Sequence, residues 1–268
     1  MTSSKRLYER AVKNEAPLAP LWHVGDGKML FAGCLGRNVM HSHSVPVLLA
    51  AIYEKFVLRI GGCKWVYCRT AVIPAGTAYE FDAGHRPLAV IYLEPNVASA
   101  DALLPFVRTE CEMSGAVVGQ GGQLGLIRDL YETADSPQWV CQALDDLIGF
   151  SKVKGARLRD ERIARAVDSL SQPNGHTLSI DDIIAQIGLS PSRFQHLFTQ
   201  FVGVPFRSYR SWSRMRFAVR EIIAGSNFTT SAHAAGYSDQ SHFAHDFRRI
   251  FGAPASCSLA NVRQSPLP

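Results

Sequence analysis

Two groups of residues in this 268-residue chain have types and spacing suited to chemistry. His41 and His43 alternate, so a strand would place both imidazoles on one side, where they can ligate a metal ion or line a ligand pocket. The stretch "GYSDQSHFAHDFRRIFG" (236–252) combines a polar front with phenylalanines four residues apart. Such a segment predicts a helix that packs through its phenylalanines and offers its polar front to a partner.

The second group belongs to an internal repeat. "GLSPSRFQHLFTQFVGVP" (188–205) aligns with "GYSDQSHFAHDFRRIFGAP" (236–254) at an offset of 48 residues, which becomes 49 after one inserted residue. The two copies share a turn glycine, a serine, two phenylalanines, a histidine and a closing Gly-x-Pro. Self-similarity of this kind indicates one supersecondary unit that occurs twice.

Each copy predicts two helices joined by a tight turn. Gly188 and Gly236 end the first helix, because glycine adopts the left-handed conformation at little cost. Ser190 and Ser238 then cap the second helix. This is the helix-turn-helix layout, whose second helix presents its early residues to base edges in the major groove of DNA.

The segment between the copies predicts one long helix over residues 206–224. At 1.5 Å per residue such a helix spans about 28 Å. That length is close to one turn of DNA, roughly 34 Å, so the second helix of each copy is expected to enter successive major grooves.

The net positive charge of the chain comes entirely from its C-terminal part. Residues 1–155 carry 15 Lys+Arg and 15 Asp+Glu, whereas residues 156–268 carry 13 Arg and 8 Asp+Glu, and 13 − 8 gives the whole net charge of +5. The planar fork of arginine suits phosphates and guanine edges. The distribution favours a polyanionic partner, with phosphate contacts expected from Arg207, Arg210, Arg214, Arg216 and Arg248.

The N-terminal half has a different pattern. Segments 47–60, 63–73 and 87–95 are rich in Val, Ile, Tyr and Phe and are separated by glycine or proline, which predicts a small β-barrel or sandwich. Residues 101–150 show helical spacing, with Ser136 expected to cap the last helix. An apolar stripe on this helix predicts packing within the chain: Val140, Leu144, Leu147, Ile148. "SKVKGA" (151–156) is expected to be a linker.

Composition limits the location of the protein. No apolar run approaches the roughly 20 residues of a membrane helix, and the first residues lack the apolar core of a signal peptide, so a cytoplasmic protein without membrane contact is expected. The six cysteines form no C-x-x-C pair and should stay reduced. Cys63 and Cys68 are either a redox pair or, as we favour for the cysteines in general, packed interior residues.

Residues 158–256 resemble the AraC/XylS family of bacterial transcription regulators. The resemblance is carried by Gly188-x-Ser190, the paired phenylalanines, and the long motif from Ala232 to Pro254. It implies base-reading positions at Ser192, Gln195, His196, Gln240, Ser241, His242 and His245, and we add Arg193, Arg214 and Arg248 to the predicted DNA contacts. The Tyr-Arg that commonly follows the final proline is missing, so the last helix is expected to be shorter or packed differently.

The resemblance also implies an overall organisation. The fold class is α+β, with a cupin-like β-barrel that senses an effector and dimerises (1–150) and an all-α DNA-binding domain with two helix-turn-helix motifs (157–268). The implied partners are promoter DNA, a small-molecule effector, RNA polymerase and a second copy of the chain. The resemblance makes the apolar stripe of residues 140–148 a dimer surface, as the alternative to packing within the chain. Activation of transcription, without enzyme activity or a cofactor, is the expected function. A helical protein-binding module would not explain the repeated capped turn.

"GRNVMHSHSVP" and "VIPAGTAYEF" resemble the two cupin motifs. Effector contacts are therefore expected from His41, His43, Tyr79 and His85. The alternative is a metal-dependent cupin enzyme with a helical appendage. Cupin enzymes usually keep a third histidine where this chain has Tyr79, and a closed metal site needs three or four ligands, so no metal is predicted unless His85 supplies the missing ligand.

Overall fold

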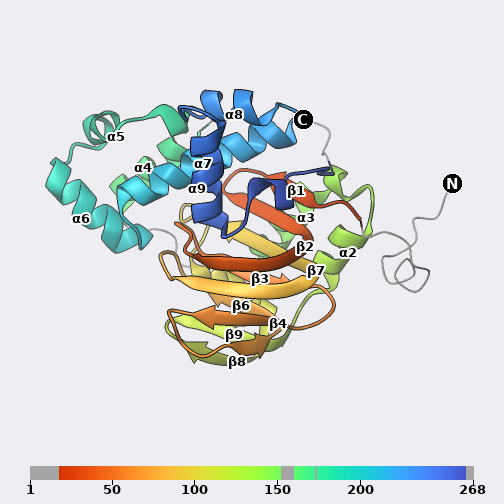
Figure 1. The fold of residues 1–268 in the computed structure, drawn as a ribbon. Coiled ribbons are helices and arrows are strands. Elements are labelled where there is room, and N and C mark those ends of the chain that lie inside the picture. The colour runs from red at the N-terminus through yellow and green to blue at the C-terminus, as the bar shows by residue number, and fades with distance from the viewer. Residues whose placement is uncertain (1–17, 152–159, 173, 264–268) are drawn as a thin grey trace.

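The computed structural model describes residues 18–151, 160–172 and 174–263. They form two domains that pack closely on each other, a barrel domain (18–151) and a helical domain (160–263) (Figure 1). The predicted linker, 151–156, lies almost entirely outside the described residues. No helix among the described residues has the length and apolar character needed to cross a membrane.

The barrel domain is built on one antiparallel sheet in the order β1-β2-β7-β3-β6-β9-β8, with β4 and β5 branching from β7. The strands are β1 (Leu21–Val24), β2 (Lys28–His41), β3 (Val47–Ala51), β4 (Phe56–Ile60), β5 (Val66–Cys68), β6 (Thr70–Ile73), β7 (Tyr79–Leu93), β8 (Val107–Met113) and β9 (Ala116–Gly122).

Strand β7 makes the sheet curl. Its first part pairs with β4, where Ile60 lies opposite Tyr79, and its second part pairs with β3, where Leu48 lies opposite Ile91. Strand β3 is buried on both faces, because alternate side chains point to opposite sides of a strand. One set of its side chains faces the interior shared with the helical domain, and the other faces a second core.

Helices cover that second core. They are a 3-10 helix (Ala100–Phe106), α2 (Gly125–Glu132), a 3-10 turn (Ser136–Gln138) and α3 (Val140–Ser151). The apolar stripe of α3 is buried against the sheet, so it packs within the chain and is not available as a dimer surface: Val140, Leu144, Leu147, Ile148.

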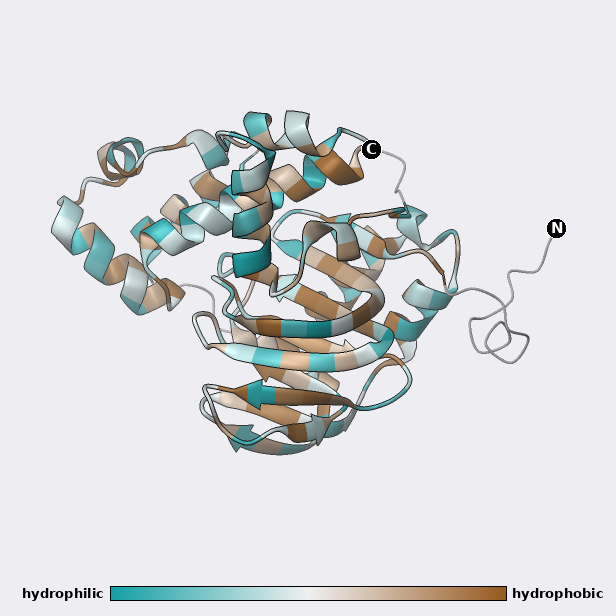
Figure 2. Ribbon diagram, in the orientation of Figure 1, coloured by the Kyte–Doolittle hydropathy of each residue, from teal (hydrophilic) through white to brown (hydrophobic). Residues whose placement is uncertain are grey.

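The helical domain contains α4 (Glu161–Ser171), α5 (Ile180–Ile187), α6 (Pro191–Val202), α7 (Phe206–Ile223), α8 (Phe228–Ala234) and α9 (Gln240–Phe251). Helix α7 confirms the predicted rod between the two copies of the repeat. Figure 2 shows mostly hydrophobic residues along the central strands, whereas α9 is largely hydrophilic. The apolar core of the helical domain continues without a break into the interior of the barrel domain.

Several local predictions for the barrel domain were wrong. Residues 107–122 form the β8–β9 hairpin instead of helix, because β9 pairs with β6 and extends the sheet. Segments 47–60 and 63–73 each divide into two strands. Ser136 begins a 3-10 turn and does not cap α3. All six cysteines are free thiols, but only Cys68 is buried, which corrects the expectation of packed interior residues.

The C-terminal segment returns to the barrel domain. After a short 3-10 turn (Ala255–Cys257), the Trp22 indole N–H donates to the Ser258 carbonyl oxygen over 2.8 Å, and Arg263 forms a parallel bridge with Leu21. The segment after the final proline of the repeat is thus a short turn that packs on β1, as the missing Tyr-Arg predicted.

Candidate nucleic-acid interface and ligand pocket

The first helix-turn-helix unit consists of α5 and α6. Helix α5 ends at Gly188, which has a φ of 66°, and the Ser190 hydroxyl accepts a hydrogen bond from the Arg193 amide over 3.4 Å at the start of α6. Pro191 occupies the first turn, where a missing N–H costs nothing. Helix α6 ends at Gly203, again in the left-handed region with a φ of 88°.

The second unit consists of α8 and α9 and is capped differently. Gly236 takes a φ of 79° in the turn, but the cap of α9 is Asp239 and not Ser238 as predicted. The Asp239 carboxylate accepts from the His242 amide over 2.8 Å, and the Ser238 hydroxyl donates to it over 3.0 Å. These hydrogen bonds lower the pKa of Asp239, so a negative charge is held at the positive end of the helix.

The second helix of each unit, α6 or α9, is called a recognition helix below. Phe194 and Phe198 of α6 are fully buried, as are Phe243 and Phe247 of α9. These rings turn the opposite face of each helix outward. The side chains predicted to contact DNA on the recognition helices are all exposed: Ser192, Arg193, Gln195, His196, Gln240, Ser241, His242, His245 and Arg248.

Two neighbours of the predicted contacts were missed by the sequence reasoning. The Thr229 hydroxyl of α8 donates to the Gln240 side-chain oxygen over 3.0 Å and orients the amide at the front of α9. Arg249 lies beside Arg248 and bonds to Asp246 over 3.1 Å. The helix-turn-helix prediction places Thr229 on the first helix of the second unit and Gln240 on the second helix. The sequence pattern does not indicate the hydrogen bond between them.

The arginines of α7 have three different roles. Arg207 is exposed and Arg210 half-buried, consistent with contacts to phosphate. Arg214 donates to the carbonyl oxygens of Ala235 and Gly236 and lies 4.4 Å above the Tyr237 ring, so its guanidinium braces the turn of the second unit.

Arg216 corrects the predicted set of phosphate contacts. Its side chain is buried and forms an ion pair with Glu94 of the barrel domain, with 2.8 Å between Nη1 and Oε1. The guanidinium therefore joins the two domains and does not reach the surface. The helical spacing of the arginines on α7 could not separate this residue from Arg210.

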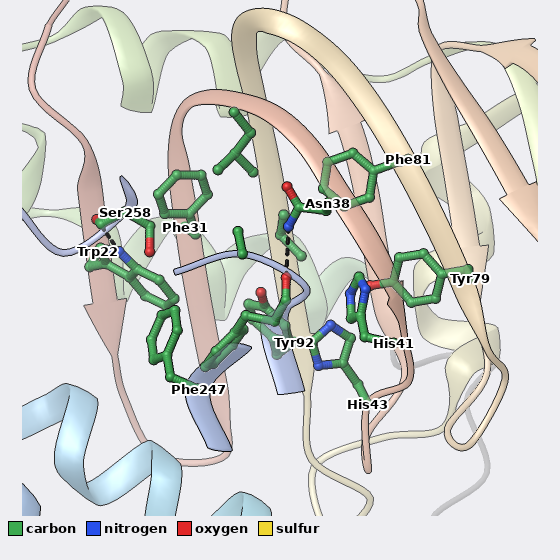
Figure 3. A pocket seen from close by; sticks show the side chains of 14 residues that line it. Trp22, Phe31, Asn38, His41, His43, Tyr79, Phe81, Tyr92, Phe247 and Ser258 are labelled. Carbon is green, nitrogen blue, oxygen red and sulfur yellow. Dashed lines mark hydrogen bonds between the residues drawn. The ribbon is translucent and has the colours of Figure 1, made fainter. Parts of the chain in front are cut away.

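The predicted effector residues converge in part. His41, His43 and Tyr79 meet at a cavity between the barrel domain and α9, with 5.0 Å between the two imidazole centroids and 4.4 Å between His41 and Tyr79 (Figure 3). His85 does not belong to this group. It is exposed on β7 beside Gly36, with a φ of 59° at the irregular pairing of β2 with β7, so the structure does not bring His85 together with the other three.

The cavity has walls from both domains. Trp22, Phe31 and Asn38 line it from the barrel, whereas Phe247 and Phe251 line it from α9. The Asn38 side-chain amide donates to the Phe251 carbonyl oxygen over 2.6 Å (Figure 3). Sequence reasoning missed Asn38 and Phe251 as pocket residues, because 213 positions separate them in the chain.

Burial controls the ionisation of the pocket. Loss of water lowers the pKa of His41 to about 4 and that of His43 well below its usual range, and it raises the pKa of Tyr79. All three side chains are therefore neutral near pH 7. The part of the chain that the structure describes contains no group of three His, Cys, Asp or Glu side chains placed to hold a metal ion, so the two histidines lack a third ligand of these types.

The barrel domain touches the ends of both recognition helices. The Val39 amide of β2 donates to the Gly252 carbonyl oxygen over 2.9 Å at the end of α9. Near the end of α6, a Cβ atom on Gly76 would lie 3.1 Å from Val204 and 3.3 Å from the Gly203 carbonyl oxygen. The C-terminal ends of α6 and α9 therefore both pack against the sheet of the barrel domain.

Comparison with known proteins supports both the helix-turn-helix domain and the overall fold. Residues 183–260 match a family model described as a helix-turn-helix domain. The Regulatory protein PocR of Salmonella typhimurium is 25% identical over 117 residues, which is 43% of this chain but only 38% of PocR.

Two crystal structures of ToxT from Vibrio cholerae share the fold. An apo variant aligns with a TM-score of 0.58 at 12% identity, covering 88% of this chain and 97% of ToxT. An unsaturated fatty acid-bound form aligns with a TM-score of 0.55 at 12% identity, covering 88% and 96%. Residues 183–260 therefore form a helix-turn-helix domain, joined to a barrel domain with the fold of ToxT.

Proposed function

We propose that this chain is a sequence-specific DNA-binding regulator of transcription, controlled by a small molecule in the barrel domain. The observation that carries the proposal is the pair of capped recognition helices with exposed polar fronts, joined by α7. The Arg-only positive charge of residues 156–268 supports a polyanionic partner.

The exposed polar residues of the recognition helices can contact both bases and phosphates of DNA. Gln195 and Gln240 carry amides that pair with adenine edges, and Ser192 and Ser241 carry hydroxyls that serve as donor or acceptor. Arg193, Arg207 and Arg248 are exposed and provide sequence-independent contacts with phosphates. Base reading is thus assigned to amides and hydroxyls, and salt-dependent affinity to arginines.

The shared cavity supports control by an effector. Phe247 and Phe251 of α9 form one wall of the pocket, so a molecule in it contacts the barrel and a recognition helix together. A ligand that prefers one placement of α9 shifts the population between DNA-binding states by its differential affinity. One of the ToxT structures has an unsaturated fatty acid bound, which is a precedent for a small ligand in this fold.

The proposal includes the setting in which the protein acts. It binds promoter DNA in the cytoplasm, activates transcription through contact with RNA polymerase, and acts by binding without catalysis. The homodimer predicted from the sequence stays a prediction. Its surface has to lie elsewhere than the buried stripe of α3.

A gel-shift titration tests the DNA-binding part. The full chain is titrated against DNA from upstream of its own gene and against a scrambled duplex, over a series of salt concentrations. We compare the wild type with the double variant Gln240→Ala, Ser241→Ala. Gln123→Ala, an exposed glutamine on the barrel domain, is the matched control.

The double variant should lose discrimination between the two duplexes, by about tenfold or more, because each base contact contributes roughly 1–3 kcal/mol. Its affinity for the scrambled duplex should change little, and Gln123→Ala should behave as the wild type. Equal losses on both duplexes would show that Gln240 and Ser241 do not read bases.

A further inference from the structure

The last residue of a recognition helix occupies the pocket of the barrel domain. The Phe251 ring lies 5.7 Å from His43, 5.8 Å from Tyr92 and 5.9 Å from Trp22, measured between ring centroids. It is almost fully buried, although it belongs to the helix whose other end offers polar residues to solvent. The first copy of the repeat has the smaller Val202 at the equivalent position.

With Phe251 in place, little room remains. The cavity beside it has a volume of about 20 Å³, and roughly 10–15 Å³ of such free space is needed for a single water molecule. A molecule the size of an aromatic ring therefore fits only if the Phe251 side chain leaves. Occupation by a ligand and occupation by Phe251 exclude each other.

The lining favours a ligand without charge. None of the 14 residues around the cavity is Lys, Arg, Asp or Glu. His41 and His43 are buried with Tyr79 and Tyr92 and the apolar rings around them, so no cation of the described part of the chain faces the space. An anion would lose its hydration here without a counter-charge, which is costly.

Three buried polar atoms of the lining have no hydrogen-bond partner among the described residues: Asn38 Oδ1, His43 Nδ1 and Tyr79 Oη. Each belongs to a side chain that is at most 5% exposed, and Figure 3 shows these side chains around the same pocket. Buried polar groups are normally paired, because an unpaired one costs free energy. A hydroxyl matches the set, because it donates to an oxygen or nitrogen and also accepts from a tyrosine.

We propose that this pocket binds an uncharged, ring-sized molecule that carries a hydroxyl group, in competition with the side chain of Phe251. The inference rests on the proposed function and names the ligand class of its effector site. Binding of the ligand displaces Phe251 and breaks the hydrogen bonds from Asn38 to Phe251 and from Val39 to Gly252. The end of α9 is thereby released from the barrel domain.

Calorimetric titration of the full chain at pH 7 tests the competition. The probes are benzyl alcohol, which has the proposed features, and benzoate, which has a similar ring and a negative charge. The proteins are the wild type, Phe251→Ala, and Val202→Ala as the control at the equivalent position of the first repeat. Removal of the competing ring raises the population of the open pocket, so Phe251→Ala should bind benzyl alcohol at least about tenfold more tightly than the wild type.

Val202→Ala should bind benzyl alcohol as the wild type does, and benzoate should bind each protein at least about tenfold more weakly than benzyl alcohol. If Phe251→Ala does not fold, Phe251→Leu replaces it, because leucine keeps the apolar contact but leaves room for part of a ring. Equal affinities of the wild type and the folded Phe251 variant, or benzoate binding as tightly as benzyl alcohol, would overturn the proposal.

The same samples are tested for DNA binding by gel shift, which separates this inference from the proposed function. If the wild type discriminates its upstream DNA but no Phe251 variant gains affinity for benzyl alcohol, only the ligand inference fails. If the variant binds benzyl alcohol as predicted but the wild type does not discriminate its upstream DNA from the scrambled duplex, the ligand inference is supported and the proposed regulatory function fails.

Discussion

The Glu94 carboxylate of the barrel domain lies 2.8 Å from the Arg216 guanidinium of α7, and both side chains are buried. The same carboxylate accepts hydrogen bonds from Ser171 over 2.6 Å, from Tyr209 over 2.9 Å and from Trp212 over 3.3 Å. Each of these donors belongs to α4 or α7. One carboxylate at the end of β7 therefore holds two helices of the DNA-binding domain against the barrel.

Removal of the charge at position 94 should destabilise the protein. Glu94→Gln leaves the buried Arg216 without a counter-charge, and breaking a buried pair typically costs about 3–5 kcal/mol. Urea unfolding should show this decrease in the free energy of unfolding. Glu112→Gln, which removes an exposed carboxylate from β8, is the control and should change stability by less than about 0.5 kcal/mol. Similar stabilities of the two variants would exclude the proposed role of Glu94.

The contact between α9 and β2 can be isolated with two glycine substitutions. Gly252 and Gly188 both have a left-handed backbone, with φ values of 73° and 66°, so Gly→Ala carries the same backbone penalty of about 1–2 kcal/mol at either site. A Cβ atom on Gly252 would lie 2.5 Å from His41 and 2.7 Å from the Val39 carbonyl oxygen, whereas no such contact within 4 Å is made by one on Gly188 in the part of the chain that the structure describes.

Gly252→Ala should therefore be less stable than Gly188→Ala by roughly 1–3 kcal/mol, the usual cost of overpacking. Urea unfolding of both variants measures the difference. Near-equal losses would mean that α9 moves away from β2 without cost.

Ser190 and Ser192 should show opposite effects, although they are two residues apart. Ser190→Ala removes the cap of α6 and should lower stability by about 1 kcal/mol, measured by thermal or urea unfolding. Ser192→Ala should leave stability unchanged, because the side chain is exposed, and should reduce discrimination between DNA sequences in the gel shift. If Ser192→Ala instead destabilises the protein, the residue has a structural role.

Arg248→Ala should reduce the dependence of DNA affinity on salt. Loss of one phosphate contact lowers the slope of log K against log salt concentration by about 0.9. Arg108→Ala removes an equal charge from an exposed site on β8 and should leave the slope unchanged. Filter binding or fluorescence anisotropy over roughly 50–200 mM salt would give both slopes. Equal changes in the two variants would indicate a general charge effect.

Stability should decrease when the solution becomes acidic. Burial lowers the pKa of His23 and of His41 to about 4, below the usual 6.5 of the unfolded chain. Between these values the unfolded chain binds protons that the folded chain does not, so the free energy of unfolding rises with pH. The contribution of the two histidines to the free energy of unfolding should reach its full value above pH 6.5. It should decrease as the pH falls from 6.5 toward 4, by up to about 1.4 kcal/mol per pH unit for each histidine.

Urea midpoints at pH 7, 6 and 5 measure this decrease. His41→Gln should make the pH dependence shallower. His245→Gln, at an exposed position of α9, is the control variant. An unchanged pH dependence in His41→Gln would mean that His41 takes up a proton as readily in the folded protein.

The sequence by itself determined the helical domain to a large extent. The turn glycines, the cap at Ser190, the paired phenylalanines and the rod of α7 were all predicted, because caps and helix faces depend on residues within about four positions of each other. The cap at Asp239 was assigned one residue too early, since a serine and an aspartate stand side by side there.

Only the tertiary structure decided how the two domains share one interior. The pairing of Glu94 with Arg216 joins residues 122 positions apart, and Asn38 meets the end of α9 although no local pattern links them. The β8–β9 hairpin was equally hidden, because β9 pairs with β6, which is distant in the chain, and β8 pairs with β9. Local propensities fix helices and turns, whereas strand pairing and domain contacts are chosen by the burial of surfaces that are distant in the chain.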